Sequence, residues 1–112
     1  MPKVYITQIP HKTDVVTGDF VPSINISPAQ EHGEIVVMLP HQTSFYATGE
    51  LVRRLRKHLT DYNYEAGDAL IALGDPSVIA VASALLGRMH GTFLLLKWDR
   101  HLSRYTPSHI KV

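Results

Sequence analysis

Gly74-Asp75-Pro76-Ser77 is the stretch whose residue types come nearest to binding chemistry. It follows a strand-like apolar run and precedes a second apolar run with helical spacing. The N–H groups at a helix start can bind an anion such as phosphate. However, Pro76 lacks an N–H, Asp75 would repel an anion, and the glycine-rich nucleotide-binding patterns are missing. We therefore predict that Asp75 caps the helix with its own side chain. A nucleotide or phosphate site formed by Gly74, Asp75 and Ser77, in a binder or an enzyme, is the alternative.

A second candidate is the cluster of cations Arg53, Arg54, Arg56 and Lys57. These side chains would suit phosphates or an acidic protein surface. They would equally suit the solvated face of an amphipathic helix, with Glu50 paired to Arg54 four residues on. The formal charge of the chain is only +1, from 11 basic and 10 acidic residues, whereas nucleic-acid modules usually carry a clear basic excess. We predict an exposed face that binds nucleic acid weakly and without sequence preference.

Metal and catalytic patterns are missing from the sequence. The seven histidines form neither H-x-x-x-H nor H-E-x-x-H, and His32 with Glu34 has no evident third ligand. There is no G-x-S-x-G elbow and no close pair of carboxylates. We predict no metal site, no cofactor and no catalytic residues. This favours a non-enzymatic role while leaving an enzyme open.

The composition is that of a globular protein acting inside a cell. With 112 residues, 45% of them hydrophobic, the chain suffices for one domain with a real core. The absence of cysteine excludes disulfides and thiolate chemistry and fits a reducing compartment. We see no signal peptide, and the longest apolar region, 70–86, is interrupted by Gly-Asp-Pro. We expect a cytoplasmic protein without a membrane contact.

The periodicity predicts a small single-domain α/β sandwich with two helices and a mixed, partly parallel sheet. The order is strand, loop, strand, helix, strand, helix, strand, strand. The predicted strands are 4–9, 34–39, 69–73, 92–98 and 105–112, and the predicted helices are 48–62 and 76–90. The unit 69–98 has the length of one crossover between parallel strands, and Pro107 places the last strand at an edge of the sheet.

Several finer expectations follow from the same patterns. Residues 10–33 form a long loop or arm, with a turn at 17–19 and one helical turn at 28–33 closed by Gly33. Thr48 is the expected cap of the first helix. The apolar run 34–39 predicts a strand buried on both faces. We expect six residues of the crossover unit to be largely buried: Ile79, Val81, Leu85, Leu86, Leu94 and Leu96.

The chain resembles small proteins of unknown function encoded by tailed bacteriophages. The resemblance rests on the strand–Gly-Asp-Pro–helix unit, on the hairpin at Lys97-Trp98-Asp99-Arg100, and on Tyr105 with Pro107. It covers nearly the whole chain. It implies a phage origin and the host cytoplasm as the place of action, but it carries over no catalytic residue.

The Trp98-Asp99-Arg100 segment has two interpretations. Asp99 can start a turn that Arg100 stabilises, and a tryptophan beside an arginine at a rim is a common interface anchor. Our leading hypothesis is a phage accessory protein that acts as an interaction module on a host or phage protein and forms a homodimer. The interaction candidates are Arg53, Arg54, Arg56, Lys57, Trp98 and Arg100.

Overall fold

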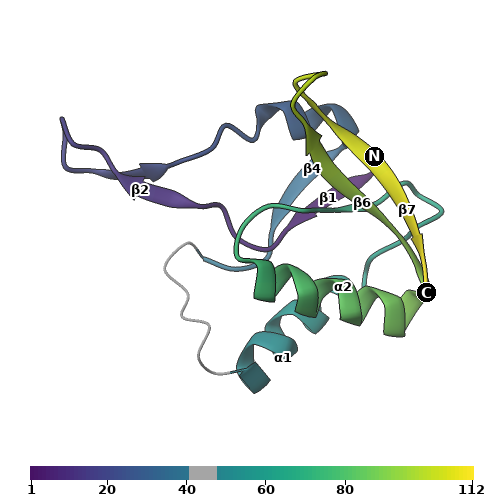
Figure 1. Ribbon diagram of the computed structural model, residues 1–112. Helices are drawn as coiled ribbons and strands as arrows, with labels where there is room; N and C mark the ends of the chain where they lie inside the picture. The colour runs from purple at the N-terminus through teal and green to yellow at the C-terminus, as the bar shows by residue number, and fades with distance from the viewer. Residues whose placement is uncertain (41–47) are drawn as a thin grey trace.

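The computed structural model describes residues 1–40 and 48–112, which form a five-stranded mixed sheet with helices on both faces (Figure 1). The strand order is β4-β1-β5-β6-β7, and the first four strands run parallel while β7 returns antiparallel to β6. The predicted α/β fold with a partly parallel sheet is confirmed. The strands are β1 (Lys3–Ile6), β4 (Glu34–Val37), β5 (Ala69–Ile71), β6 (Thr92–Asp99) and β7 (Arg104–Lys111).

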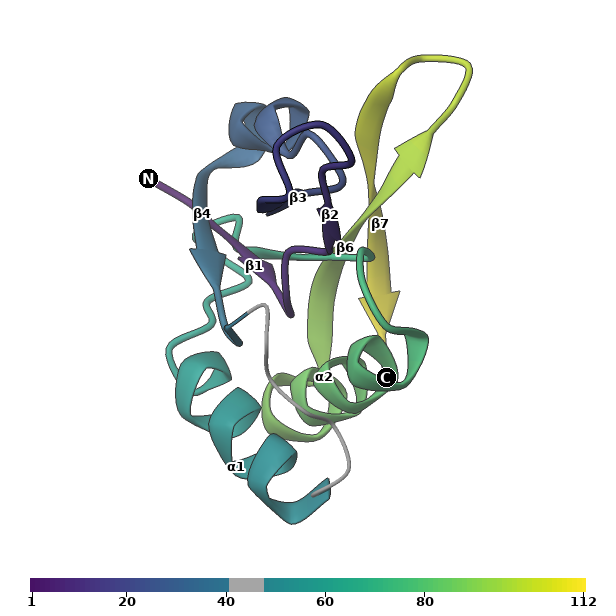
Figure 2. The same cartoon turned by 90° about the vertical axis from the view of Figure 1, so that its left-hand side faces the viewer.

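The two long helices, α1 (Thr48–Leu59) and α2 (Pro76–His90), lie together on one face of the sheet, and the short helix η1 (Ser27–His32) lies on the other (Figures 1 and 2). The strand order explains this division. The connections from β4 to β5 and from β5 to β6 cross the sheet in the same direction, whereas the connection from β1 to β4 goes the opposite way. Because crossovers between parallel strands are almost always right-handed, opposite directions place the connections on opposite faces.

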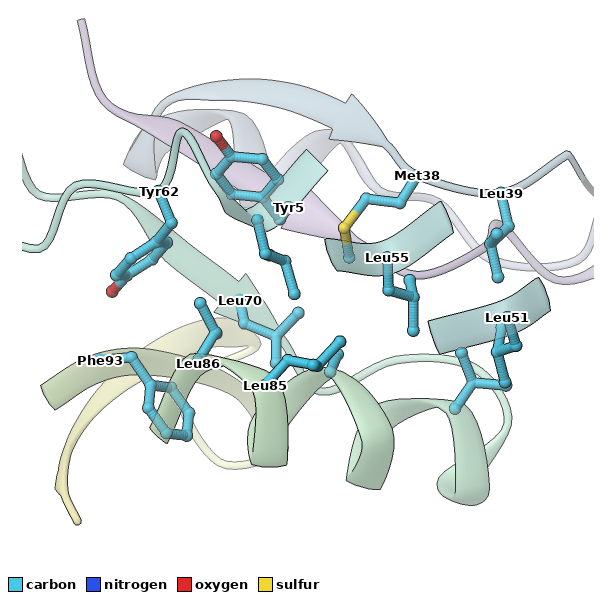
Figure 3. Packing of buried hydrophobic residues seen from close by; sticks show 13 residues of the cluster. Tyr5, Met38, Leu39, Leu51, Leu55, Tyr62, Leu70, Leu85, Leu86 and Phe93 are labelled. Carbon is cyan, nitrogen blue, oxygen red and sulfur yellow. The ribbon is translucent and has the colours of Figure 1, made fainter. Parts of the chain in front are cut away.

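Alternating side chains of the strands build two cores. On the helical face, Tyr5, Leu70 and Phe93 pack against the apolar stripes of both helices, as Figure 3 shows. On the η1 face, the buried residues come from four strands and from η1: Val4, Ile6, Ala29, Ala69, Ile71, Leu96 and Tyr105. Both faces are thus covered, as parallel sheets require.

The expected burial of the crossover unit is half right. Leu85, Leu86 and Leu96 are buried, but Ile79, Val81 and Leu94 are only partly buried. The buried stripe of α2 is instead Val78, Ala82, Leu85 and Leu86. This narrow stripe follows the helical repeat, and it leaves the apolar residues beside it at the rim of the packed face.

The expectation for 34–39 is wrong. β4 ends at Val37, and its side chains are exposed or partly buried because β4 is the edge strand beside β1. Met38 and Leu39 are buried although they follow the strand. Their backbone N–H groups donate to Ile6 and Thr7, so the chain continues alongside β1. An apolar run reports burial, but it does not report the position of a strand within a sheet.

Other boundaries also shift. β1 ends at Ile6, β5 at Ile71 and α1 at Leu59, each earlier than predicted. α1 begins at Thr48 itself, so Thr48 is a helical residue, and the residue before it lies in 41–47, outside the described residues. His41 lies in that segment as well.

Residues 10–33 contain a projecting hairpin followed by η1 (Figure 1). Strands β2 (His11–Thr13) and β3 (Phe20–Pro22) pair antiparallel in a small sheet of their own, which we call the arm. The turn at its tip includes Gly18, with φ of 76°. The predicted helical turn is confirmed as η1 and is closed by Gly33. A Cβ at Gly33 would lie 2.3 Å from the carbonyl oxygen of Pro2, so only glycine fits there.

Candidate functional site

The Gly74–Ser77 junction is a helix cap built from its own residues. One carboxylate oxygen of Asp75 accepts a hydrogen bond of 2.8 Å from the backbone N–H of Ser77 and another from the Ser77 hydroxyl. These hydrogen bonds from Ser77 hold the pKa of the Asp75 carboxyl below its usual value of 3.8. The predicted N-cap is confirmed. Because the N–H of Ser77 already donates to this carboxylate, it is not free to bind an anion.

This junction also lies where open α/β sheets often bind ligands. The connections that leave β1 and β5 go in opposite directions, and ligands favour the crevice at such strand ends. Here the Thr7 hydroxyl, just after β1, donates to the carbonyl of Leu73, after β5, over 3.2 Å. Gly74 has φ of 109°, and a Cβ there would lie 3.1 Å from that hydroxyl oxygen. The two strand ends therefore contact each other directly, while a ligand at the junction stays a hypothesis.

The four cations of α1 are exposed, and α1 lies on the face of the sheet opposite to η1. Glu50 forms ion pairs with both Arg53 and Arg54, the second at 3.0 Å. Half of the cluster is therefore matched by a carboxylate on the same helix. Leu55, within the same stretch, is fully buried in the core. The arrangement is that of an amphipathic helix with a solvated outer face.

The η1 face contains an apolar hollow of about 450 Å³, which we call the Trp98 pocket. Three segments far apart in the sequence form its walls: the chain from the arm into the start of η1, the residues just after β5, and the hairpin of β6 and β7. The lining residues are Ile24, Asn25, Pro28, Ala72, Leu73, Trp98 and Tyr105. Apart from Asn25 and the phenol of Tyr105, the side chains that line it are hydrocarbon or indole. The hollow is therefore suited to apolar groups.

Trp98 is the exposed wall of this pocket. It pairs with Tyr105 across β6 and β7, and the two rings meet edge to face with centroids 5.0 Å apart. Tyr105 is buried, and burial raises the pKa of its phenol. Trp98 remains 47% exposed. A large indole left half in solvent beside a hollow is a typical anchor position for a binding partner.

The hairpin that carries Trp98 is held in place near its turn. Asp99 accepts hydrogen bonds from the backbone N–H groups of His101 and Leu102, which confirms the turn predicted there. Arg104 forms an ion pair of 3.1 Å with Glu31 of η1. A ring nitrogen of His32 lies 3.0 Å from the carbonyl oxygen of Tyr105. The opposing walls of the pocket are thereby tied together.

A second hollow of about 390 Å³ continues from the first toward the arm. Both include Ile24 and Asn25 in their walls. The arm ends in Val15 and Val16, which are 97% and 89% exposed. An apolar surface thus extends from the Trp98 pocket toward the base of the arm, and two further apolar side chains stand at the arm's tip.

Sequence patterns identified this site only in part. Trp98 and Arg100 were predicted as interaction residues, and the structure puts Trp98 in the pocket wall and Arg100 in the exposed turn beyond it. Ile24, Leu73 and Tyr105 were missed as site residues. The sequence offered one sign for Ile24. It is an apolar residue in a loop bounded by prolines, and it does not belong to the apolar repeat of any helix or strand. Its proximity to Trp98 has no local signature, because the chain must first fold to bring them together.

The fold and the site define a small α/β protein with an apolar hollow on the η1 face of its sheet. The chain belongs to the Phage Pam3 gp32-like protein family, whose family model matches residues 2–112. The resemblance to a family of small phage proteins is therefore confirmed over nearly the whole chain. No curated protein and no solved structure matches it. Within the part of the chain that the structure describes, no helix is long and apolar enough to cross a membrane.

Proposed function

We propose that this phage protein is a non-enzymatic interaction module that binds a protein partner, encoded by the phage or its host, in the host cytoplasm. The Trp98 pocket holds apolar side chains of that partner. The observation that carries the proposal is the half-exposed Trp98 beside an apolar hollow of about 450 Å³. Tryptophan and tyrosine are enriched among the residues that dominate binding energy in protein interfaces.

The character of the surface favours a protein over a nucleic acid. Nucleic-acid affinity comes largely from cations that neutralise phosphates. The pocket has an apolar lining, and two of the four cations on α1 are paired with Glu50. The formal charge of +1 provides little long-range attraction for a polyanion.

The arm provides a second contact for such a partner. Fully exposed valines at the tip of a projecting hairpin contribute nothing visible to the fold of the chain. Adjacent apolar side chains left in solvent, on a protein that also has an open apolar hollow, favour an interaction surface. The partner would therefore contact both the pocket and the arm.

The experiment compares variants of the tagged protein in phage-infected cells. Trp98→Ala and Ile24→Glu alter the pocket, while Arg56→Glu alters an exposed cation on α1 as a matched control. The proposal expects a protein that the unmodified chain and the Arg56→Glu variant both capture and that both pocket variants lose. The purified partner should then shift the fluorescence of Trp98, the only tryptophan of the chain. Capture that survives both pocket variants but fails with Arg56→Glu would show that α1, and not the pocket, is the binding surface.

A further inference from the structure

Among residues 1–40 and 48–112, two apolar features remain without a counterpart. The arm tip presents Val15 and Val16 almost fully to solvent, and the Trp98 pocket lies open on the η1 face. The arm projects away from the body in Figure 1 and toward the viewer in Figure 2, so the tip does not enter the pocket of its own chain. The arm tip is a protruding apolar group, and the Trp98 pocket is an apolar hollow that could receive one.

We propose that the arm tip of one copy inserts into the Trp98 pocket of a second copy of this chain. The inference deepens the proposed function and rests on it, because it names the partner of the same pocket. Each copy then donates one arm and accepts another, either reciprocally in a dimer or in a closed ring.

Size and reach permit this contact. A cavity of about 150 Å³ holds a benzene molecule, so a pocket of about 450 Å³ has room for two valine side chains. The six residues from Pro10 to the tip extend about 20 Å at the rise of a β-strand. The backbone N–H of Ser23 donates to the carbonyl of Pro10 over 2.8 Å, which closes the base of the arm. The tip is thus presented at a distance from its own body.

The charges beside the two features are opposite. Asp14 and Asp19 flank the arm tip, and Asp14 accepts hydrogen bonds from the N–H groups of Val16 and Thr17. Arg100 is exposed in the turn next to Trp98 and, among the described residues, forms no ion pair. An acidic tip that approaches a pocket with an arginine in the turn beyond it has complementary potential.

The stability of the arm supports the same conclusion. An isolated two-stranded hairpin is at best marginally stable in water. The arm forms a sheet separate from the main one, and its tip residues are exposed. Burying the valines in a neighbouring copy would add apolar packing at the tip of the hairpin.

The test uses mixed variants and the single tryptophan. Val15→Ser with Val16→Ser removes the apolar tip and keeps the pocket. Trp98→Ala alters the pocket, keeps the arm and contains no tryptophan. In a mixture of the two, the only tryptophan lies in the pocket that should receive an arm. We expect each variant alone to associate about tenfold or more weakly than the unmodified protein. The mixture should form a heterodimer whose tryptophan emission shifts to the blue.

The matched control mixes the tip variant with a chain that carries all three substitutions, and this mixture should neither associate nor shift. Ile24→Glu serves as a second pocket variant that retains the tryptophan, and thermal unfolding checks that every variant is folded. Light scattering that finds the unmodified protein monomeric up to millimolar concentration would overturn the inference. The inference would also be overturned if the tip variant and the Trp98→Ala variant, each alone, associated as strongly as the unmodified protein. If the unmodified protein is monomeric but still captures another protein through Trp98, the inference fails and the proposed function stands.

Discussion

At the scale of single residues, buried polar groups hold separate segments together. The carboxylate of Asp68 accepts hydrogen bonds from the backbone N–H groups of Lys3, at 2.9 Å, and Asn63, at 3.0 Å. The Tyr62 hydroxyl donates to the carbonyl of Asp68 over 2.8 Å and accepts from the N–H of Leu94 over 2.9 Å. These contacts join β1, the loop after α1, and β6. Removing a partner from such a set leaves a buried group unpaired, which costs more than the hydrogen bond itself contributes.

We predict that Tyr62→Phe lowers the free energy of unfolding by about 1 to 3 kcal/mol at neutral pH, because the N–H of Leu94 loses its acceptor. Urea unfolding measures the change. A loss below about 0.5 kcal/mol, a typical surface effect, would contradict this role of the hydroxyl.

The Tyr62 phenol should also make the free energy of unfolding depend on pH. Burial raises the pKa of Tyr62 from 10.0 to about 12. The stabilisation is therefore complete below pH 10 and is lost as the pH rises toward 12, since the unfolded chain releases the proton more readily. The difference in unfolding free energy between the unmodified protein and Tyr62→Phe should shrink over that range. A difference that stayed constant would show that the phenol does not titrate with unfolding.

Asp75 should make the stability depend on pH in the opposite direction, with a loss at low pH. Because the pKa of its carboxyl is lowered in the folded state, its stabilisation is present above the ordinary value of 3.8 and is lost as the pH falls below it. Asp75→Ala should lower the melting temperature at neutral pH and have a smaller effect in acid. Asp75→Asn is the control, because asparagine caps a helix without titrating. Equal effects of alanine and asparagine would show that the cap does not depend on the side-chain hydrogen bond.

At the scale of elements, the two long helices cover one face of the sheet and leave the other face for the site. α1 and α2 pack on each other as well as on the strands, and their shared core contains Leu55, Leu59 and Leu86, all fully buried. The η1 face is covered by a short helix and an extended segment, which are thinner than a pair of helices. The hollow beside Trp98 lies on this less completely covered face.

We predict that Leu86→Ala lowers the free energy of unfolding by about 2 to 5 kcal/mol, through lost burial and the cavity that remains. The matched control is Leu102→Ala, in the exposed turn between β6 and β7, which should change it by less than about 0.5 kcal/mol. Denaturant unfolding measures both. Similar costs at the two positions would contradict the core placement of α2.

At the scale of the whole molecule, charge is nearly balanced and apolar groups are unevenly distributed. The formal charge is +1, while large exposed apolar side chains occur at both projecting hairpins, with Val15 and Val16 on the arm and Trp98 and Leu102 on the hairpin of β6 and β7 (Figure 2). Such a molecule is suited to association through apolar contacts more than through long-range attraction.

We therefore predict that nucleic-acid binding is weak and independent of sequence. A titration with labelled DNA or RNA at physiological salt should give at most micromolar affinity, as expected for non-specific binding. The double variant Arg53→Glu with Arg56→Glu should lower it further by removing cations. Submicromolar, sequence-selective binding that this variant abolishes would make α1 the functional surface instead.

Signals that act over a few residues allowed much of the fold to be predicted from the sequence. Asp75 before Pro76 predicted the start of α2, because a cap depends only on its immediate neighbours. Gly33 predicted the end of η1 for a similar reason. The apolar stripe of α1 follows the helical repeat, and Leu51, Leu55 and Leu59 on that stripe are buried.

The order of the strands and the apolar hollow beside Trp98 could be known only from the tertiary structure. Three of the four residues of β4 are apolar, yet β4 is an edge strand, since its position depends on the direction of the crossovers around β1. The same directions put both long helices on one face and left the other to η1. The Trp98 pocket forms only when Ile24, Leu73 and Trp98 meet on that face. Capping and periodicity are encoded in neighbouring residues, whereas this meeting depends on how segments far apart in the chain pack around one sheet.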